Sequence, residues 1–315
     1  MSAFRVVITD PLVPDHEIER EIITAAGGEL EAPGGDPTAV VEAARNADGL
    51  LNTYFPLPAE VINTLERCKV IARYGIGVDN VDLAAASAKG IAVTNVPDYC
   101  VEEVATHALG LIIDLVRRIV VANDLVRGGG WGVANLGPVR RLSVLTIGLV
   151  GYGKIARRLG ELLAPVGCPV IIHDPYVREV AASQRLVELP ELLATSDVVS
   201  LHCPLTPETR GMINASTIET MRDGAILLNV ARGGLVVTSD VIAALSAGKL
   251  GGAGLDTFER EPPDLAGLAE ARGANLIATP HAAFYSIQST QESQRKAATQ
   301  VVKAIAGEPL DYPVN

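Results

Sequence analysis

Three side chains that could together bind and protonate a carbonyl compound lie far apart in the second half of the sequence, and they are Arg232, Glu261 and His281. Each follows an apolar run with the length of a buried strand. Reduction of a ketone by hydride needs a cation for the substrate carboxylate, a proton donor for the new hydroxyl and a group that tunes this donor. An arginine fork, a histidine and a glutamate that stabilises the imidazolium meet these needs. On spacing alone, three unrelated surface residues are an equal alternative.

A glycine-rich segment follows the apolar run 146–150 and reads Gly151-Tyr152-Gly153-Lys154-Ile155-Ala156. Tight glycines at a strand end let backbone N–H groups approach a pyrophosphate at the N-terminus of the next helix. Asp174 follows about twenty residues later, where an acid accepts hydrogen bonds from an adenosine ribose and repels a 2′-phosphate. The pattern predicts a dinucleotide site that favours NAD over NADP. The plainer alternatives are a tight turn and a helix cap before Pro175.

A proline-stiffened segment, His202-Cys203-Pro204-Leu205-Thr206-Pro207-Glu208-Thr209, follows another strand-like run. Parallel strands end at one edge of their sheet, so we expect this segment near the adenosine half of the cofactor. The candidate contacts are Cys203, Pro204 and Thr209. For His202, spacing favours a buried strand-end histidine over a catalytic group.

The elements that position these residues form two sets of alternating strands and helices. The first set has strands at 4–8, 49–53 and 70–74 and helices at 18–26, 40–46 and 59–67. This alternation predicts parallel strands with helical crossovers. Gly75 and Gly77 then mark a loop at the carboxyl end of a strand, where open parallel sheets bind their ligands.

The second set begins after an amphipathic helix expected from Val101 to Val126, with strands at 146–150, 170–173, 198–201, 225–229, 252–255 and 276–279. A last helix near 290–306 is expected to return to the first set. This predicts an α/β fold of two Rossmann-like or flavodoxin-like domains, with doubly wound parallel sheets and a cleft between them. The expected domains are 1–98 plus 286–315 for substrate and 99–285 for NAD.

Composition excludes several other classes of protein. The 315 residues are 48% apolar, enough for two buried cores. A net charge of −11, with no basic cluster longer than a pair, argues against a nucleic-acid surface. It also requires that a site for an anionic substrate supply its own cation. No membrane-spanning run and no signal peptide are recognisable, so the expected location is the cytoplasm.

The four cysteines are dispersed, at positions 68, 100, 168 and 203, without a C-x-x-C pair. This spacing predicts reduced core thiols in place of metal ligands or disulfides, and no metal site is expected.

In these motifs the chain resembles the D-isomer-specific 2-hydroxyacid dehydrogenase family, in the branch of the 3-phosphoglycerate dehydrogenases and the C-terminal-binding corepressors. The resemblance spans nearly the whole chain. It is carried by residues 73–82, the Gly151 motif, and the segments 202–205, 229–234, 254–256, 259–262 and 280–283.

The resemblance implies a role for each candidate residue. His281 would be the acid–base residue, Glu261 its partner and Arg232 the group that orients and polarises the substrate. NAD would be the cofactor, with further contacts from Val230, Ala231 and Asp256, the last near the nicotinamide carboxamide. The substrate carboxylate would bind backbone N–H groups of the loop that begins Tyr74-Gly75-Ile76-Gly77, with Arg73 as a second cation and the small domain closing over the cofactor.

Two features of the sequence leave the identity of the substrate open. Phe284 follows His281-Ala282-Ala283 where many relatives carry a small residue, and the corepressors carry a bulky aromatic one. Tyr54 and Phe55 are candidates for an apolar pocket wall, with core packing as an equal alternative.

The resemblance implies reduction of a small 2-keto acid by NADH to the D-2-hydroxy acid, in a homodimer. Because the sequence stops soon after the helix expected near 290–306, no appended regulatory domain is expected. One alternative is an NAD-responsive, corepressor-like binding protein with residual dehydrogenase activity. A less economical one is an enzyme that oxidises an inorganic or one-carbon acid.

Overall fold

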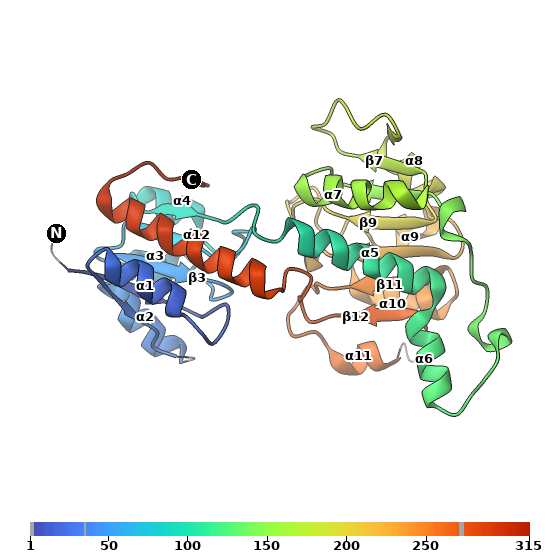
Figure 1. Cartoon of the computed structure of the whole chain (residues 1–315), viewed down its shortest axis with the longest axis horizontal. Helices are drawn as coiled ribbons and strands as arrows, with labels where there is room; N and C mark the ends of the chain where they lie inside the picture. Colours follow the sequence, from blue (N-terminus) through green and yellow to red (C-terminus); the bar gives the residue numbers. More distant parts are fainter. Residues whose placement is uncertain (1–2, 35, 271–273) are drawn as a thin grey trace. The chain divides into compact units, whose positions relative to one another are not determined.

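A computed structural model describes residues 3–34, 36–270 and 274–315 (Figure 1). The chain divides into two compact units, of which the first comprises residues 1–99 and 285–315 and the second residues 100–284. Each unit is an all-parallel sheet with helices. The predicted α/β class with two doubly wound sheets is confirmed.

The sheet of the first unit has the strand order β2-β1-β3-β4-β5, with bounds β1 (Phe4–Ile8), β2 (Gly28–Glu31), β3 (Gly49–Asn52), β4 (Val70–Arg73) and β5 (Ala92–Thr94). This is the flavodoxin-like order. Its helices are α1 (Glu17–Ala25), α2 (Pro37–Arg45), α3 (Ala59–Thr64), α4 (Leu83–Ala88) and α12 (Ile287–Ala306). Helix α12 packs beside α1 and against β3 and β4, so the last helix does return to the first sheet (Figure 1).

The sheet of the second unit has the order β12-β11-β10-β9-β6-β7-β8. Its strands are β6 (Ile147–Val150), β7 (Val170–His173), β8 (Gln184–Leu186), β9 (Val198–Leu201), β10 (Ala225–Asn229), β11 (Leu250–Leu255) and β12 (Leu276–Ala278). The order reverses between β6 and β9, which makes this junction the ligand-binding switch point of a Rossmann sheet. Because strands inside such a sheet are covered on both faces, β6, β9 and β10 are buried along their whole length.

The helices of the second unit are α5 (Val101–Arg117), α6 (Ile119–Arg127), α7 (Lys154–Leu163), α8 (Leu189–Thr195), α9 (Ala215–Thr220), α10 (Thr238–Ser246) and α11 (Leu265–Glu270). Short 3₁₀ turns lie at Val133–Leu136, Leu142–Val144, Ala164–Val166 and Gly233–Leu235. Among the described residues, no helix is both long and apolar enough to cross a membrane.

The prediction of a single helix from Val101 to Val126 is wrong, because the helix is interrupted at Arg118. Arg118 has a left-handed φ of 54° and ends α5. The carboxylate of Asp114 then accepts the N–H of Val120 at 3.0 Å and caps the start of α6. The Arg118 guanidinium donates to the carbonyl of Leu136 at 2.9 Å, which holds the break in place.

Candidate active site

The glycine-rich turn has the geometry that a bound pyrophosphate requires. Gly151 has a φ of +89°, and a Cβ there would lie 2.7 Å from the backbone nitrogen of Cys203, so only glycine fits. Helix α7 begins at Lys154, and its N-cap, Gly153, supplies no side-chain cap. A Cβ on Gly153 would meet nothing within 4 Å. Since no side chain caps the helix, the first-turn N–H groups, including that of Ile155, fit an anion.

Asp174 lies beside this turn, after β7. Its carboxylate accepts the N–H of Tyr152 at 2.8 Å and that of Tyr176 at 2.9 Å. The next helix, α8, begins only at Leu189, so the helix-cap interpretation of Asp174 is wrong. Carboxylate oxygens that hold the glycine turn retain lone pairs for ribose hydroxyls. The turn and the acid together fit a dinucleotide.

The segment after β9 meets the glycine turn at the switch point. The Nε2 of His202 lies 2.9 Å from the Ser200 hydroxyl, and burial lowers the pKa of His202 to about 4. A neutral, inward-bonded ring favours the structural interpretation of His202. Burial also raises the pKa of the Cys203 thiol to about 11, and Asp174 adds to this rise.

The Thr209 hydroxyl donates to the carbonyl of Pro204 at 2.8 Å and accepts the N–H of Thr206 at 2.8 Å, which fixes the loop. All four cysteines are free thiols. In the described part of the chain, no cluster of three or more His, Cys, Asp or Glu residues could hold a metal ion.

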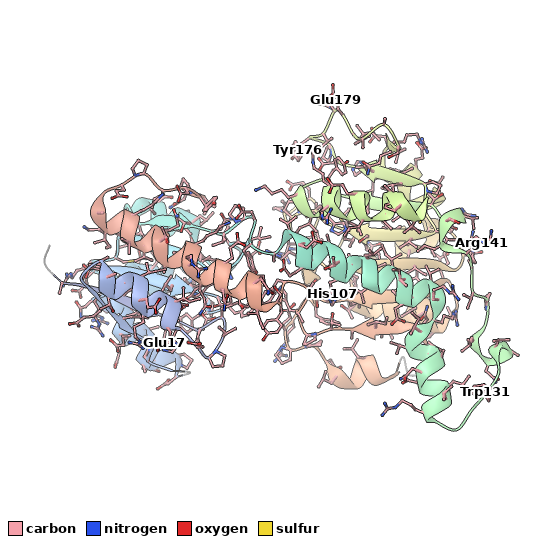
Figure 2. The ribbon with its side chains drawn as sticks, viewed as in Figure 1. Glu17, His107, Trp131, Arg141, Tyr176 and Glu179 are labelled. Carbon is pink, nitrogen blue, oxygen red and sulfur yellow. The ribbon has the colours of Figure 1, made fainter. Side chains whose placement is uncertain are left out.

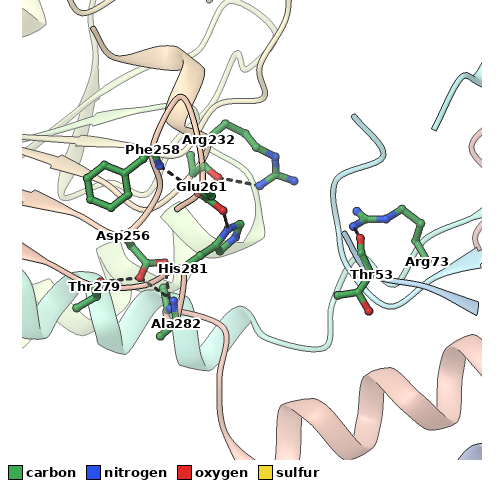
Figure 3. A network of polar contacts seen from close by, with 11 residues as sticks. Thr53, Arg73, Arg232, Asp256, Phe258, Glu261, Thr279, His281 and Ala282 are labelled. Atoms are coloured by element: carbon green, nitrogen blue, oxygen red, sulfur yellow. Dashed lines mark hydrogen bonds and ion pairs between the residues drawn. The ribbon is translucent and has the colours of Figure 1, made fainter. Parts of the chain in front are cut away.

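The structure brings Glu261 and His281 together as a hydrogen-bonded pair (Figure 3). The Nδ1 of His281 lies 2.8 Å from Oε2 of Glu261, and Oε1 of Glu261 accepts the N–H of Phe258 at 3.1 Å. Burial by itself would raise the pKa of Glu261, but the hydrogen bond and charge of His281, the Phe258 N–H and the charge of Arg232 together lower it. Glu261 is therefore an ionised acceptor that directs the Nδ1 proton of His281 toward itself.

Arg232 follows β10 at the start of a 3₁₀ turn. Its Nη1 donates to the carbonyl of Ala231 at 2.7 Å, and its own carbonyl accepts from the side chain of Asn229 at 2.9 Å. A Cβ on Gly233 would lie 1.9 Å from the backbone of Phe258, so a glycine is needed where these two loops meet. The close approach explains how the charge of Arg232 reaches Glu261. Val230, just before the turn, is buried.

Asp256 has a role that its sequence context did not indicate. It is buried, and Oδ1 accepts the Thr279 hydroxyl at 2.6 Å and the Ala282 N–H at 2.8 Å, while Oδ2 accepts the Ala283 N–H at 3.0 Å (Figure 3). Asp256 therefore holds both ends of the loop that carries His281. The expected contact of Asp256 with the nicotinamide carboxamide stays a prediction.

Sequence reasoning missed two further members of this network, Thr279 and His107. The Nε2 of His107, on α5, lies 3.2 Å from the Thr279 hydroxyl and 3.9 Å from Asp256. A histidine within an otherwise apolar helix face was the only sequence signal for His107.

Phe284 lies edge-on to the His281 ring, with the ring centroids 6.2 Å apart.

In the first unit, the loop after β4 turns its carbonyls inward. The carbonyls of Gly75 and Ile76 accept from the N–H of Val96 at 3.1 Å and from the side chain of Asn95 at 2.7 Å. The carbonyl of Gly77 accepts from Arg73. The N–H groups of residues 75–78 donate to no acceptor among the described residues, so they are available to an anion.

Tyr74 does not join these donors. Its N–H donates to the carbonyl of Asn52 at 2.9 Å, and its fully buried hydroxyl donates to Glu19 at 2.7 Å. The expectation that the Tyr74 backbone binds a carboxylate is therefore corrected, since β-sheet pairing already uses its N–H.

Arg73 also differs from its expected role as a second cation. It is buried and donates inward to Asn52 at 3.3 Å and to the carbonyls of Thr53 and Gly77. These contacts join two loops and favour a structural role for Arg73.

The Tyr54 side chain is 53% exposed, which excludes core packing for this ring.

The model of the family "D-isomer specific 2-hydroxyacid dehydrogenase, NAD binding domain" matches residues 109–283. The chain is similar to the D-3-phosphoglycerate dehydrogenase of Mycobacterium tuberculosis, with 35% identity over 326 residues that cover 100% of this chain and 59% of the relative. The chain thus spans well under two thirds of that relative's length.

Two further relatives are matched along most of their length. The glycerate dehydrogenase of Methylorubrum extorquens is 36% identical over 279 residues, 87% of each chain. The crystal structure of the D-lactate dehydrogenase of Aquifex aeolicus, complexed with NAD and lactic acid, superposes with a TM-score of 0.89 at 29% identity, over 96% of each chain. These relatives are named for dehydrogenase activities, which does not favour the corepressor-like alternative. The glycine-rich turn that fits a pyrophosphate, the match to the family's NAD-binding domain and the NAD bound to the Aquifex aeolicus relative all support NAD as the cofactor.

Proposed function

This chain belongs to the D-isomer-specific 2-hydroxyacid dehydrogenase family, and on that premise we propose that it interconverts a small 2-keto acid and the D-2-hydroxy acid. NADH, when bound, supplies the hydride that reduces C2 of the keto acid. The observation that carries the proposal is the 2.8 Å contact between Glu261 and His281, in the same unit as a turn that fits a dinucleotide. A proton donor with an ionised partner is what carbonyl reduction requires.

In this proposal His281 donates the proton that the new hydroxyl needs. Glu261 holds Nδ1, so the opposite ring nitrogen, Nε2, gives its proton to the carbonyl oxygen as the C–O double bond becomes single. Glu261 stabilises the imidazolium before transfer. In the oxidative direction the same nitrogen takes the proton back.

Arg232 is proposed to orient the substrate carboxylate and polarise the carbonyl. The N–H groups of residues 75–78 supply further donors to the carboxylate, which supports the assignment of Gly75, Ile76 and Gly77 to substrate binding. Exposed Tyr54, and Phe284 beside His281, are the proposed apolar contacts to the substrate side chain. Residues 1–98 with 286–315 thus form the proposed substrate domain.

Residues 99–285 form the proposed NAD-binding domain. Gly151, Gly153, Lys154 and Ile155 would hold the pyrophosphate, and Asp174 the adenosine ribose. The adenosine half would lie against Cys203, Pro204 and Thr209, and the nicotinamide half near Val230, Ala231 and Asp256.

A homodimer is proposed from an exposed apolar arm, defined here as residues 119–144. No residue of α6 is buried, and the following loop exposes 84% of Trp131 and 83% of Val133. Figure 2 shows Trp131 on a segment that projects from the second unit. Large exposed apolar side chains on one segment mark an interaction surface, and a second copy is the partner that a family of oligomeric enzymes favours. The expected cytoplasmic location stays a prediction.

The test of the proposed function is NADH oxidation at neutral pH with glyoxylate, pyruvate, hydroxypyruvate, and branched-chain and aryl 2-keto acids, with NADPH as the cofactor control. Turnover of at least one keto acid, faster with NADH than with NADPH, is expected because Asp174 repels a 2′-phosphate. Tight NADH binding without turnover of any of these acids would contradict the proposal.

A further inference from the structure

The switch point of the first sheet is filled by a carboxylate of the protein itself. Strand order reverses between β1 and β3, so the loops after these strands flank the crevice in which such sheets bind ligands. Asp10, after β1, accepts the N–H groups of three successive residues after β3: Thr53 at 3.0 Å, Phe55 at 3.0 Å, and Tyr54 between them. The Thr9 hydroxyl adds a fourth hydrogen bond at 2.8 Å.

Three successive backbone N–H groups aimed at one point form an anion-binding nest. Here the anion is Asp10, so these donors are not available to a ligand. Arg73 is the last residue of the neighbouring strand β4. Its guanidinium likewise donates within the protein, to the carbonyls of Thr53 and Gly77. The nest and the cation that could have bound a second anionic group are both used inside the protein.

The remaining charges on this edge are acidic. The segments that follow the five strands of the first sheet are residues 9–15, 32–36, 53–58, 74–80 and 95–99. They contain no Lys or Arg, and their charged residues are Asp10, Asp15, Asp36, Asp79 and Asp98. Lys296 of α12 reaches this edge but pairs with Asp98 at 2.7 Å and with Glu292 at 2.6 Å.

The geometry points to a specificity rule, which rests on the proposed function: this chain acts on 2-keto acids with an uncharged side chain and rejects their phosphorylated counterparts, with Asp10 as a specificity-determining residue. A phosphate monoester carries close to two negative charges and needs cations or free N–H donors. Here it would meet an occupied nest and an acidic edge, whereas the single carboxylate of a 2-keto acid still has the N–H groups of residues 75–78. Relatives named for phosphoglycerate and for glycerate both match this chain, and the inference places it with the unphosphorylated substrates.

The first experiment compares kcat/KM for hydroxypyruvate and 3-phosphohydroxypyruvate with NADH, two substrates that differ only in the phosphate. We expect hydroxypyruvate to be preferred by about 100-fold or more, because Asp10 already fills the nest and the carboxylates of this edge repel a phosphate dianion. Equal or reversed preference would overturn the inference and leave the proposed function standing.

A binding measurement separates the two hypotheses if turnover is absent. Calorimetry on the NAD-loaded protein with D-glycerate and 3-phospho-D-glycerate needs no catalysis. Weaker binding of the phosphorylated acid would support the specificity rule even where the proposed function fails. Binding of neither acid would overturn both.

The role of Asp10 itself is tested with Asp10→Asn, and with Asp36→Asn as the matched control. Asp36 lies on the same edge, where it caps α2 by accepting the Thr38 N–H at 3.0 Å, but it occupies no nest. Asp10→Asn should raise the ratio of kcat/KM for the phosphorylated substrate over hydroxypyruvate by about tenfold, and Asp36→Asn should leave it unchanged. Far-UV circular dichroism and a cooperative urea transition verify that both variants are folded, because the two substitutions lie in the first unit. An unchanged ratio in a folded Asp10→Asn protein would overturn the assignment of Asp10.

Discussion

The Thr279 hydroxyl donates a 2.6 Å hydrogen bond to buried Asp256 and so connects the end of β12 to the end of β11. The next turn of chain carries His281 in the left-handed region, at a φ of +52°, where a non-glycine residue is strained. The His281 N–H donates to the carbonyls of Asp256 at 2.8 Å and Thr279 at 3.0 Å. The orientation of the His281 ring, the proposed proton donor, therefore depends on the hydrogen bond between Thr279 and Asp256.

Thr279→Val keeps the shape of residue 279 but removes the hydroxyl. We expect kcat to fall by about 10- to 100-fold with little change in NADH affinity, because a small misplacement of the His281 ring weakens its contact with Glu261. The alkaline limb of the pH profile should also move to lower pH. Steady-state kinetics between pH 5 and 10 measure both effects.

Thr279→Ser restores the hydroxyl and is the matched control, with activity close to wild type. If Thr279 acts through the Glu261–His281 pair, Thr279→Val should shift the pH profile no further in a Glu261→Gln background. Additive shifts would show that Thr279 affects catalysis by another route.

Glu261→Gln tests the partner of His281. The pKa of Glu261 is lowered, so in the wild type it is a carboxylate at neutral pH and stabilises the protonated ring. The amide in the Glu261→Gln variant cannot stabilise the protonated ring in this way. On the alkaline side of the pH profile, activity should therefore be lost at a lower pH than in the wild type, and kcat should fall by about 10- to 100-fold at neutral pH. A pH–rate profile that matches wild type would remove Glu261 from the mechanism.

Arg232→Ala removes the proposed carboxylate fork and the polarising charge together. A loss of about 10²- to 10³-fold in kcat/KM is expected, with NADH affinity little changed. Arg260→Ala removes an exposed arginine from the nearby loop and serves as the control for the loss of charge. Similar activities in the two variants would contradict the role of Arg232.

The loop that binds the substrate carboxylate in this proposal depends on a buried acid. Glu19 accepts the Tyr74 hydroxyl at 2.7 Å and the Gln294 side chain at 2.9 Å, and burial raises its pKa above 4.5 despite these bonds. A raised folded-state pKa gives a stabilisation that is complete below pH 4.5 and lost as the pH rises through the folded value.

Glu19→Gln should abolish that pH dependence. Its free energy of unfolding should be lower than wild type by about 1–3 kcal/mol at pH 4.5, because one hydrogen bond of the network becomes a donor–donor contact. The deficit should shrink toward neutral pH as the wild type loses its own contribution. Urea denaturation at several pH values measures this, and a deficit that is constant with pH would contradict the assignment to Glu19.

Much of the fold and of the site could be predicted from the sequence, since long apolar strands and glycine turns are local signals. The missed strands β2, β5 and β8 are all edge strands of only three or four residues, and β2 and β8 are also polar. Arg73 and Asp256 were recognised, but their partners come from distant segments, such as Thr53 and Thr279. Hydrogen bonds between segments carry no spacing signal, so these roles needed the structure.

The exposed arm, residues 119–144, gives the last prediction. Trp131→Ser with Val133→Ser removes its two most exposed apolar side chains, at 84% and 83%. A dimer held by this arm should weaken by about 2 kcal/mol, or about 30-fold in Kd, and shift toward monomer in sedimentation velocity across micromolar concentrations. Tyr176→Ser, at a residue 91% exposed outside the arm (Figure 2), should change nothing. Because these side chains pack against no core, neither variant should lower the unfolding free energy appreciably, and an unchanged dimer would place the interface elsewhere.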